Sequence, residues 1–331
     1  MENQAGSTGE PDLQVGFDLG GTKMQASVLQ RDGTMLSSER VPSRGNDGMD
    51  EGLLRMIDLT RQAISTAGVP AERVSAIGVA CPAVVDLERG VLVEAPNLGW
   101  ENVPVAEAFE KAFPGKQVAV LNDVDAGTFG EYLFGAGQGA RTVLGIFPGT
   151  GLGGGCVYDG TLLRGRRYSC MEIGNLRLPG PSLFGSRESP ARVEEIVSRL
   201  GLAGAAAVAA YRGDAPTVFE NCGSDLSLIK SGALAAAAKA GDPAVLEAID
   251  NCIFYLSIAT AGAVDLLGPD RIVLGGGLVE KMPEIFTQGL EKHVKKLVSR
   301  GLAGELEVVA ASLGDNASVV GAAAFAAEKI F

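Results

Sequence analysis

The sequence has 331 residues, with 46% hydrophobic and 21% charged residues, and this length predicts two domains rather than one core. No apolar run approaches the roughly 20 residues that span a bilayer, and residues 1–12 lack the basic start and apolar stretch of a secretory signal. The formal net charge of −12 disfavours binding to nucleic acid, whose phosphate backbone it would repel.

The first half of the chain predicts an α/β lobe. Apolar residues alternate along residues 14–29 around a central DLGGTK, and the pattern resumes at residues 34–42 after a break at residues 31–33, which predicts three strands joined by turns. Helical spacing or short apolar runs then predict, in chain order, a helix at 51–67, a strand at 74–80, a helix at 105–113 and a strand at 118–121. This alternation is typical of an α/β fold.

The second half repeats the same theme. A helix at 126–134 precedes the strand TVLGIFPG, the run GTGLGGG and the strand CVYDGTLL. The Ala-rich stretch 192–268 predicts several packed helices, and residues 271–274 predict a buried strand. The last helix, expected at 317–330, should cross back and pack on the first lobe.

The glycine turn between the first two predicted strands is suited to binding phosphate. Gly20 and Gly21, followed by Thr22 and Lys23, can present backbone N–H groups to a triphosphate without obstruction by side chains. Asp18 ends the preceding strand and could hold Mg²⁺ through water, because hard cations favour carboxylate oxygens. A plain hairpin turn is the alternative interpretation of this segment.

Two more glycine-rich runs follow predicted strands in the second half of the chain. Their candidate nucleotide-binding residues are Gly149, Thr150 and Gly151, and Gly275, Gly276 and Gly277. The first run adds a hydroxyl to the exposed amides, and the second allows a base or phosphate to approach the backbone closely. Three such runs, distributed over both halves, predict an ATP site more strongly than any one of them.

The pair Asn122-Asp123 follows a buried strand and opens a helix. Phosphoryl transfer to an alcohol needs a carboxylate near the attacking hydroxyl, and Asp123 is placed to be that general base. Its alternative role is a helix N-cap. Asn122 could orient a sugar hydroxyl through its amide.

Taken together, the sequence resembles the ROK family of sugar kinases and sugar-responsive repressors. The resemblance spans nearly the whole chain and rests on DLGGTK (18–23), LNDVDA (121–126), GTGLGGG (149–155) and VLGGG (273–277). It implies an actin-like ATPase (ribonuclease H-like) fold with a ligand cleft between two lobes, residues 1–122 plus 316–331 and residues 123–315. It also implies ATP with Mg²⁺, a hexose or hexosamine substrate, a homodimer, and Asp123 as general base.

The resemblance also implies which residues contact the sugar. They are Asn97, Asn122, Asp123, Glu172, Asn175 and Glu194. A pair of carboxylates suits sugar recognition because each oxygen can accept a hydrogen bond from a separate hydroxyl. A solvated position on a helix is the alternative for Glu194.

The segment before Asn175 departs from the family pattern. It reads RRYSCMEIGN, so Asn175 stands where the family usually has a zinc-ligating His, and no cysteine cluster lies between Asn175 and Glu194. We therefore expect no zinc, which places the chain closest to zinc-free glucokinase-like members, some of which use polyphosphate. Glucose is the leading acceptor, although Tyr168 and Met171 would crowd the loop and change sugar choice.

Two other functions compete with a sugar kinase. A sugar-responsive transcriptional regulator would need an N-terminal DNA-binding domain, and about a dozen residues precede the first predicted strand. A non-catalytic sensor of sugar or nucleotide would arise if the altered loop had closed the sugar site.

The five cysteines are scattered without paired spacing, which is typical of reduced thiols in a cytoplasmic protein. The single histidine, His293, lies in a polar helical stretch, which is typical of a solvated helix position rather than a catalytic one.

Overall fold

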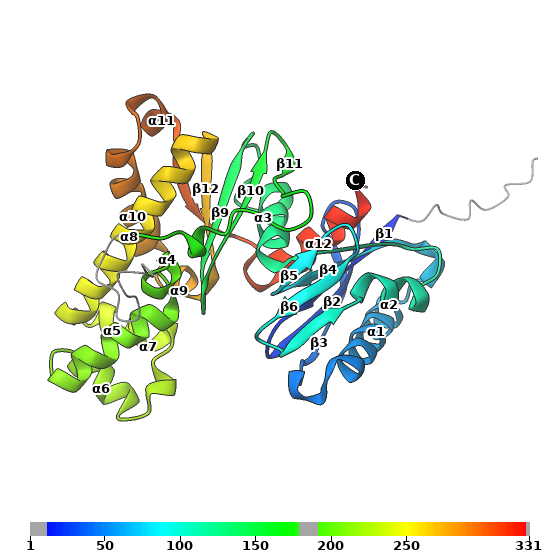
Figure 1. The fold of residues 1–331 in the computed structure, drawn as a ribbon, viewed down its shortest axis with the longest axis horizontal. Helices are drawn as coiled ribbons and strands as arrows, with labels where there is room; N and C mark the ends of the chain where they lie inside the picture. The colour runs from blue at the N-terminus through cyan, green and yellow to red at the C-terminus, as the bar shows by residue number, and fades with distance from the viewer. Residues whose placement is uncertain (1–11, 179–190, 329–331) are drawn as a thin grey trace, which may run out of the picture. The chain divides into compact units, whose positions relative to one another are not determined.

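The computed structural model describes residues 12–178 and 191–328, which form two compact units. Residues 12–134, 164–170 and 315–328 make the first unit, and residues 135–163, 171–178 and 191–314 make the second. Each unit contains a five-stranded sheet with helices packed on it (Figure 1). The predicted α/β architecture is therefore present in both halves of the chain.

The first unit is built on the sheet β3-β2-β1-β4-β8, in which β1, β4 and β8 are parallel. A second, antiparallel sheet has the order β5-β6-β7. In chain order the elements are β1 (Leu13–Leu19), β2 (Lys23–Leu29), β3 (Met35–Pro42), α1 (Met49–Thr66), β4 (Val74–Cys81), β5 (Val84–Asp86), β6 (Val91–Ala95), β7 (Trp100–Val103), α2 (Val105–Ala112), β8 (Gln117–Asn122), α3 (Asp123–Phe134) and α12 (Ala317–Ala327).

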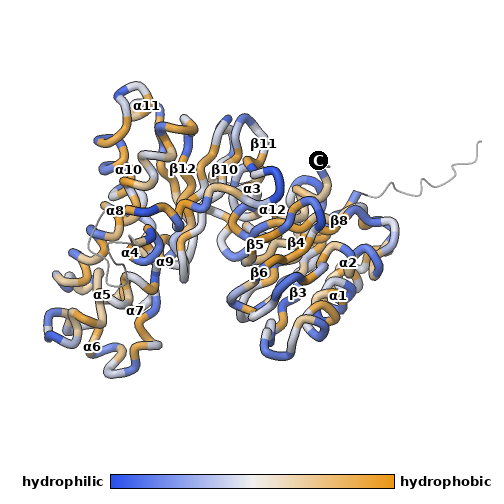
Figure 2. The backbone as a smooth tube through the Cα atoms, in the orientation of Figure 1, coloured by the Kyte–Doolittle hydropathy of each residue, from blue (hydrophilic) through white to orange (hydrophobic). Residues whose placement is uncertain are grey.

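Side chains on β1 alternate between two differently covered faces of this sheet. Val15, Phe17 and Leu19 are buried in a core shared with α1 and α2, where the ring centroids of Phe17 and Phe109 lie 6.0 Å apart. Residues 16 and 18 point to the other face, which α12 covers, because successive side chains of a strand alternate (Figure 1). Figure 2 shows apolar residues in orange along the central β4 and hydrophilic residues on the edge strand β3.

Helix α12 lies with its backbone directly on the sheet, and glycines make this possible. Gly16 of β1 and Gly78 of β4 are register neighbours. A Cβ atom on either one would overlap a backbone carbonyl of α12, at Val319 and Ala322 respectively. Gly321 in α12 similarly permits close approach to α3. The C-terminal helix therefore packs on the first unit, as the sequence predicted.

The second unit repeats the strand order of the first, as β11-β10-β9-β12-β13, again with two parallel pairings, β9-β12 and β12-β13, and two antiparallel pairings, β9-β10 and β10-β11. Its elements are β9 (Val143–Pro148), β10 (Leu152–Tyr158), β11 (Thr161–Leu162), the 3-10 turn η3 (Ile173–Asn175), α4 (Val193–Ile196), α5 (Arg199–Arg212), α6 (Pro216–Cys222), α7 (Ser231–Lys239), α8 (Pro243–Leu267), β12 (Arg271–Leu274), α9 (Gly276–Lys281), α10 (Pro283–Leu297), α11 (Arg300–Glu305) and β13 (Glu307–Ala310).

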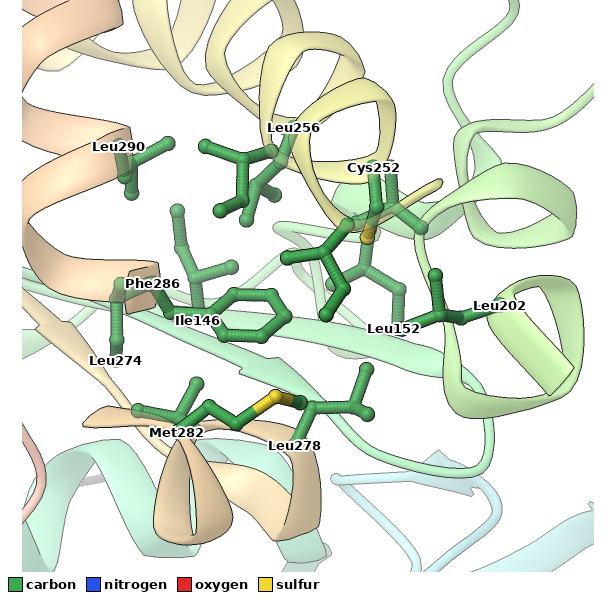
Figure 3. Close-up of a cluster of buried hydrophobic side chains, with 14 of the residues drawn as sticks. Ile146, Leu152, Leu202, Cys252, Leu256, Leu274, Leu278, Met282, Phe286 and Leu290 are labelled. Atoms are coloured by element: carbon green, nitrogen blue, oxygen red, sulfur yellow. The ribbon is translucent and has the colours of Figure 1, made fainter. Parts of the chain in front are cut away.

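The core of the second unit lies between its sheet and the helices α8 and α10. Phe286 is fully buried there among aliphatic side chains that include Leu256 and Leu274 (Figure 3). Helix α8 is long and apolar enough to cross a membrane, but half of its most apolar window is buried inside the unit. We therefore interpret α8 as a core helix.

The close contact of α12 with the sheet predicts a large effect of one added methyl group. We expect Gly78→Ala to lower the free energy of unfolding by about 2–3 kcal/mol or more, because the backbone carbonyl of Ala322 cannot yield as a side chain would. Urea unfolding measures the change. Gly204 in α5 is the matched control, since its added Cβ would meet open space, and Gly204→Ala should be neutral or stabilising by up to about 1 kcal/mol. Equal effects of the two substitutions would contradict the packing argument.

Two features differ from what the sequence predicted. Helix α3 begins at Asp123, where the pair Asn122-Asp123 was predicted to open a helix, but it packs against α12 in the first unit, whereas the predicted lobe boundary placed it in the second. Residues 164–170 also belong to the first unit. There the Arg167 guanidinium forms an ion pair with the buried Asp86 carboxylate at 2.9 Å, and the Leu87 N–H donates to the Arg167 carbonyl at 2.9 Å.

Candidate functional site

The carboxyl ends of the parallel strands bring together the predicted acidic residues of the first unit. Asp18 lies near the end of β1 opposite Ala80 of β4, and Cys81 at the end of β4 pairs with Asn122 of β8. Asp123 follows directly. Ligands of open α/β sheets commonly bind at such strand ends, so the sheet topology itself assembles this cluster.

Asp18 is an unusual carboxyl group. Its burial, followed by the nearby Asp123 carboxylate, raises its pKa from an ordinary 3.8 to about 7, although Lys23 acts in the opposite direction. A buried carboxyl near a second carboxylate favours its neutral form unless a cation accompanies it. The pair therefore fits a divalent cation, because hard cations favour carboxylate oxygens and would remove the repulsion.

Asn122 has a structural role that the sequence analysis did not assign to it. Its side-chain oxygen accepts hydrogen bonds from the backbone N–H groups of Val124 at 2.8 Å and Asp125 at 3.3 Å. Its amide nitrogen donates to the Ala83 carbonyl at 3.4 Å. Asn122 thus caps α3, and the Asp123 carboxylate also accepts from the Val124 N–H, at 3.0 Å, so the two side chains share the role considered for Asp123.

The first glycine turn is a tight reversal between β1 and β2. The Gly20 N–H donates to the Lys23 carbonyl at 2.9 Å, and a Cβ on Gly20 would lie 2.6 Å from that oxygen, so glycine is required there. The Ser43 N–H donates to the Thr22 carbonyl at 2.9 Å and braces the turn. The Lys23 ammonium pairs with Asp315 at 2.7 Å, in an ion pair whose two side chains are each more than half exposed.

Asn97 lies beside this turn. A Cβ on Gly21 would be 3.4 Å from the Cβ of Asn97, which is itself an exposed residue. The indole N–H of the buried Trp100 donates to the Gly45 carbonyl at 3.3 Å and holds the segment after Asn97 in place. The predicted sugar contact and the predicted phosphate turn are therefore neighbours within the first unit.

In the second unit, two glycine runs that are far apart in sequence lie side by side. Gly276 has a left-handed φ of 82°, and a Cβ there would lie 2.9 Å from the Pro148 carbonyl oxygen and 3.4 Å from the Gly149 nitrogen. Gly149 donates to the Gly151 carbonyl at 2.9 Å, which closes a tight turn around Thr150. Only glycine permits this contact between the two backbones.

Next to these runs lies a pair of carboxylates. Burial and, after it, the Glu194 carboxylate raise the pKa of Glu172, while a hydrogen bond from Asn175 opposes them. The side chain of Glu194 is only 28% exposed, and its Oε2 accepts from the Leu152 N–H at 3.4 Å. Glu194 is therefore a constrained residue rather than a solvated helix position.

Arg192, which was not predicted from the sequence, links Glu194 to Asn175, and Asn175 in turn donates to Glu172 at 3.3 Å. Its guanidinium forms an ion pair with Glu194 at 2.8 Å and donates to the Asn175 side-chain oxygen at 3.4 Å. It also pairs with Glu195 at 3.2 Å. One cation thus connects η3, which ends at Asn175, with α4.

Two further charged residues at the glycine runs were also not predicted. Asp315 pairs with Lys23 at the first turn. Arg199 donates to the Thr150 hydroxyl at 3.0 Å. Neither belongs to one of the predicted glycine motifs, so no local pattern marked these two residues.

The structure tests for a metal site in residues 12–178 and 191–328. Within these residues, no group of three or more His, Cys, Asp or Glu side chains could hold a metal ion. Part of the segment where the family has its cysteine cluster, residues 179–190, lies outside the described residues. The absence of zinc therefore stays a prediction.

The repeated sheet topology, with glycine runs and carboxylates at its strand ends, defines an actin-like ATPase fold, and comparison with known proteins agrees. The chain belongs to the ROK family, whose profile matches residues 14–329. It is 30% identical over 323 residues to a glucokinase from Streptomyces coelicolor, covering 96% of this chain and 98% of that protein.

Two solved structures are similar over nearly the whole chain. A ROK family glucokinase from Streptomyces griseus, crystallised with glucose and AMPPNP, is 30% identical with a TM-score of 0.78 and covers 96% of this chain and 99% of its own. A ROK hexokinase from Thermus thermophilus is 29% identical with a TM-score of 0.80, again covering 96% of this chain and 99% of its own. The predicted family and fold are confirmed.

Proposed function

We propose that this chain is an ATP-dependent sugar kinase that transfers the terminal phosphoryl group of ATP to a hexose hydroxyl, with glucose as the leading acceptor. The observation that carries the proposal is the meeting of Asp18 and Asp123 at the strand ends beside a glycine turn. The similarity to glucokinases over nearly the full length, one of them solved with glucose and AMPPNP, supports the same activity.

In the proposed reaction, Asp123 acts as the general base. It accepts the proton of the attacking sugar hydroxyl while the new oxygen–phosphorus bond forms and the bond from the phosphoryl group to ADP breaks. The Asn122 cap holds the start of α3 and so fixes the Asp123 backbone. We also propose that the Asn122 side chain, which already accepts hydrogen bonds from the start of α3, contacts the sugar.

Backbone amides of the three glycine segments are proposed to bind the phosphates of ATP. These segments are Gly20, Gly21, Thr22 and Lys23 in the first unit, and Gly149, Thr150, Gly151, Gly275, Gly276 and Gly277 in the second. Asp18 would hold Mg²⁺ through water, and Mg²⁺ would neutralise charge on the phosphates. The raised pKa of Asp18 supports this role, because a cation offsets the cost of its buried charge.

The sugar is proposed to bind through Asn97, Asp123 and the pair Glu172 and Glu194, with Asn175 as a further contact. The carboxylates suit vicinal hydroxyls because each oxygen accepts from a separate O–H. The segment before them differs from the family pattern, so the acceptor has to be tested directly. Met171, predicted to crowd this loop, instead packs against the core of the second unit.

A coupled assay of ADP release tests the proposal. We expect turnover with at least one of glucose, mannose, fructose, N-acetylglucosamine and N-acetylmannosamine, with glucose preferred. Polyphosphate in place of ATP, with glucose 6-phosphate as the measured product, tests the donor. If no sugar supports turnover at millimolar concentration while ATP still binds by calorimetry, the chain is a sensor and the proposed activity is wrong.

Arg192 should affect the sugar more than the nucleotide. We expect Arg192→Gln to raise the KM for the sugar about tenfold and leave the KM for ATP unchanged, because Glu194 would lose its cation and Asn175, which donates to Glu172, would lose a partner. Steady-state kinetics with each substrate varied in turn measure both constants. Arg212→Gln, at the far end of α5, is the control and should change neither constant. Equal changes in both KM values would contradict a role specific to the sugar.

We also propose that the protein works as a cytoplasmic homodimer without zinc, nucleic acid or membrane. The net charge of −12 disfavours nucleic acid. The exposed apolar side chains Tyr211 and Phe219, on neighbouring helices of the second unit, favour self-association. Light scattering after gel filtration measures the oligomeric state, and metal analysis of the purified protein measures zinc.

A further inference from the structure

Arg199 is the first residue of α5, and two hydrogen bonds attach it to the turn around Thr150. Its backbone N–H donates to the Gly149 carbonyl at 2.8 Å, and its Nη2 donates to the Thr150 hydroxyl at 3.0 Å. The preceding Ser198 is 3% exposed and accepts a hydrogen bond from the Gly201 N–H at 3.1 Å. Both the backbone and the guanidinium of Arg199 are therefore placed at the turn.

The charge of Arg199 is not neutralised by a carboxylate within the described ranges 12–178 and 191–328. The contrast is Arg192, seven residues earlier, which forms ion pairs with both Glu194 and Glu195. The one side-chain hydrogen bond of Arg199 in those ranges goes to the neutral Thr150 hydroxyl. A guanidinium has five N–H donors in a planar fork, so most of its hydrogen-bonding capacity stays available to an anion.

We infer that Arg199 binds the phosphate chain of the donor nucleotide, which makes it a substrate-binding residue additional to the glycine segments. The inference rests on the proposed kinase function, because it assumes that the turn around Thr150 receives phosphate. Backbone amides supply only partial positive charge, whereas ATP carries several full negative charges into a chain with a net charge of −12. An arginine can supply a full charge and two parallel hydrogen bonds to phosphate oxygens.

The chemistry explains why the Thr150 hydroxyl and Arg199 occur together. The hydroxyl accepts from the guanidinium and keeps it over the turn before the nucleotide arrives, so less side-chain entropy is lost on binding. Removing the guanidinium should weaken binding of the phosphate chain and leave recognition of adenosine and sugar intact. Affinity for inorganic tripolyphosphate should fall together with affinity for ATP.

Calorimetric titration of Arg199→Gln, Arg199→Lys and the parent protein tests the inference, with ATP, inorganic tripolyphosphate, adenosine and glucose as separate ligands. We expect Arg199→Gln to bind ATP and tripolyphosphate about ten- to a hundredfold more weakly, with the affinities for adenosine and glucose unchanged. Arg199→Lys should recover part of the loss, because it keeps the charge but not the fork. Arg212→Gln, at the other end of the same helix, should bind all four ligands like the parent.

Unchanged ATP affinity in Arg199→Gln would overturn the inference, and so would equal weakening of adenosine and ATP binding. Binding of glucose by the variant reports that it is folded, and if Arg199→Gln does not fold, Arg199→Lys provides the same comparison. The outcome is separate from that of the sugar assay. If the protein phosphorylates glucose and Arg199→Gln binds ATP normally, the proposed function stands and the inference on Arg199 fails. If Arg199→Gln weakens ATP binding but the parent protein turns over no sugar, the inference stands and the proposed function fails.

Discussion

Asp123→Asn is expected to lower kcat by about 10²–10⁴-fold with any accepted sugar, because an amide cannot accept the proton of the attacking hydroxyl. The substitution keeps the size of the side chain and leaves the Asn122 cap of α3 in place, so the sugar should still bind. The coupled assay measures kcat, and calorimetric titration with the sugar measures binding. A loss of turnover with unchanged sugar affinity would separate the chemical role of Asp123 from a role in recognition.

The matched control is Asp50→Asn, an exposed carboxylate in the first turn of α1. It carries the same loss of charge away from the site and should keep full activity. Turnover of Asp123→Asn at more than a tenth of the parent rate would remove Asp123 from the role of base.

Asp18→Asn is expected to make the protein inactive and, at the same time, more stable above pH 7. The folded state raises the pKa of Asp18 from 3.8 to about 7, so the neutral form is favoured in the folded protein. Below pH 4 the Asp18 carboxyl is protonated in both the folded and the unfolded state, so its ionisation does not change the free energy of unfolding. Between pH 4 and 7 the Asp18 carboxyl ionises in the unfolded state but stays protonated in the folded state. The free energy of unfolding therefore falls as the pH rises, and the decrease is complete above pH 7.

The asparagine variant removes this penalty because it carries no charge at any pH. Urea unfolding without Mg²⁺ should show a gain of up to about 4 kcal/mol at pH 8 that disappears at pH 4. Asp315→Asn is a control with the opposite sign, since the ion pair with Lys23 lowers the pKa of Asp315 and its ionised form is favoured in the folded state. If Asp18→Asn is no more stable than the parent at pH 8, the burial of an uncompensated carboxylate there is refuted.

Much of the fold could be predicted because its signals are local. The alternation in residues 14–29 predicts β1 and β2, and the apolar runs at 74–80 and 118–121 predict β4 and β8. The short strands β5, β6 and β7 were not predicted. They have three to five residues, and β5 pairs with β6 through an irregular register, so no regular alternation marks them.

The site could be predicted only where a residue type and its position in a strand or turn carry the chemistry. Asp18 and Asp123 were found because each stands at the end of a strand. Arg192 and Arg199 were missed because their partners, Asn175 and Thr150, lie 17 and 49 residues away in sequence. No local pattern reports such contacts. The cap by Asn122 could have been recognised, since Asn directly before a helix is a common N-cap.

The packing of α12 on Gly16 and Gly78 has a consequence for biosynthesis. The first unit draws its covering helix from residues that the ribosome adds about 180 residues after α3. During translation, one face of the strands β1 and β4 therefore stays uncovered while the whole second unit is synthesised and can fold. A chain that stops before Ala317 would lack this helix, so its first unit should be retained by chaperones rather than released as a native fold.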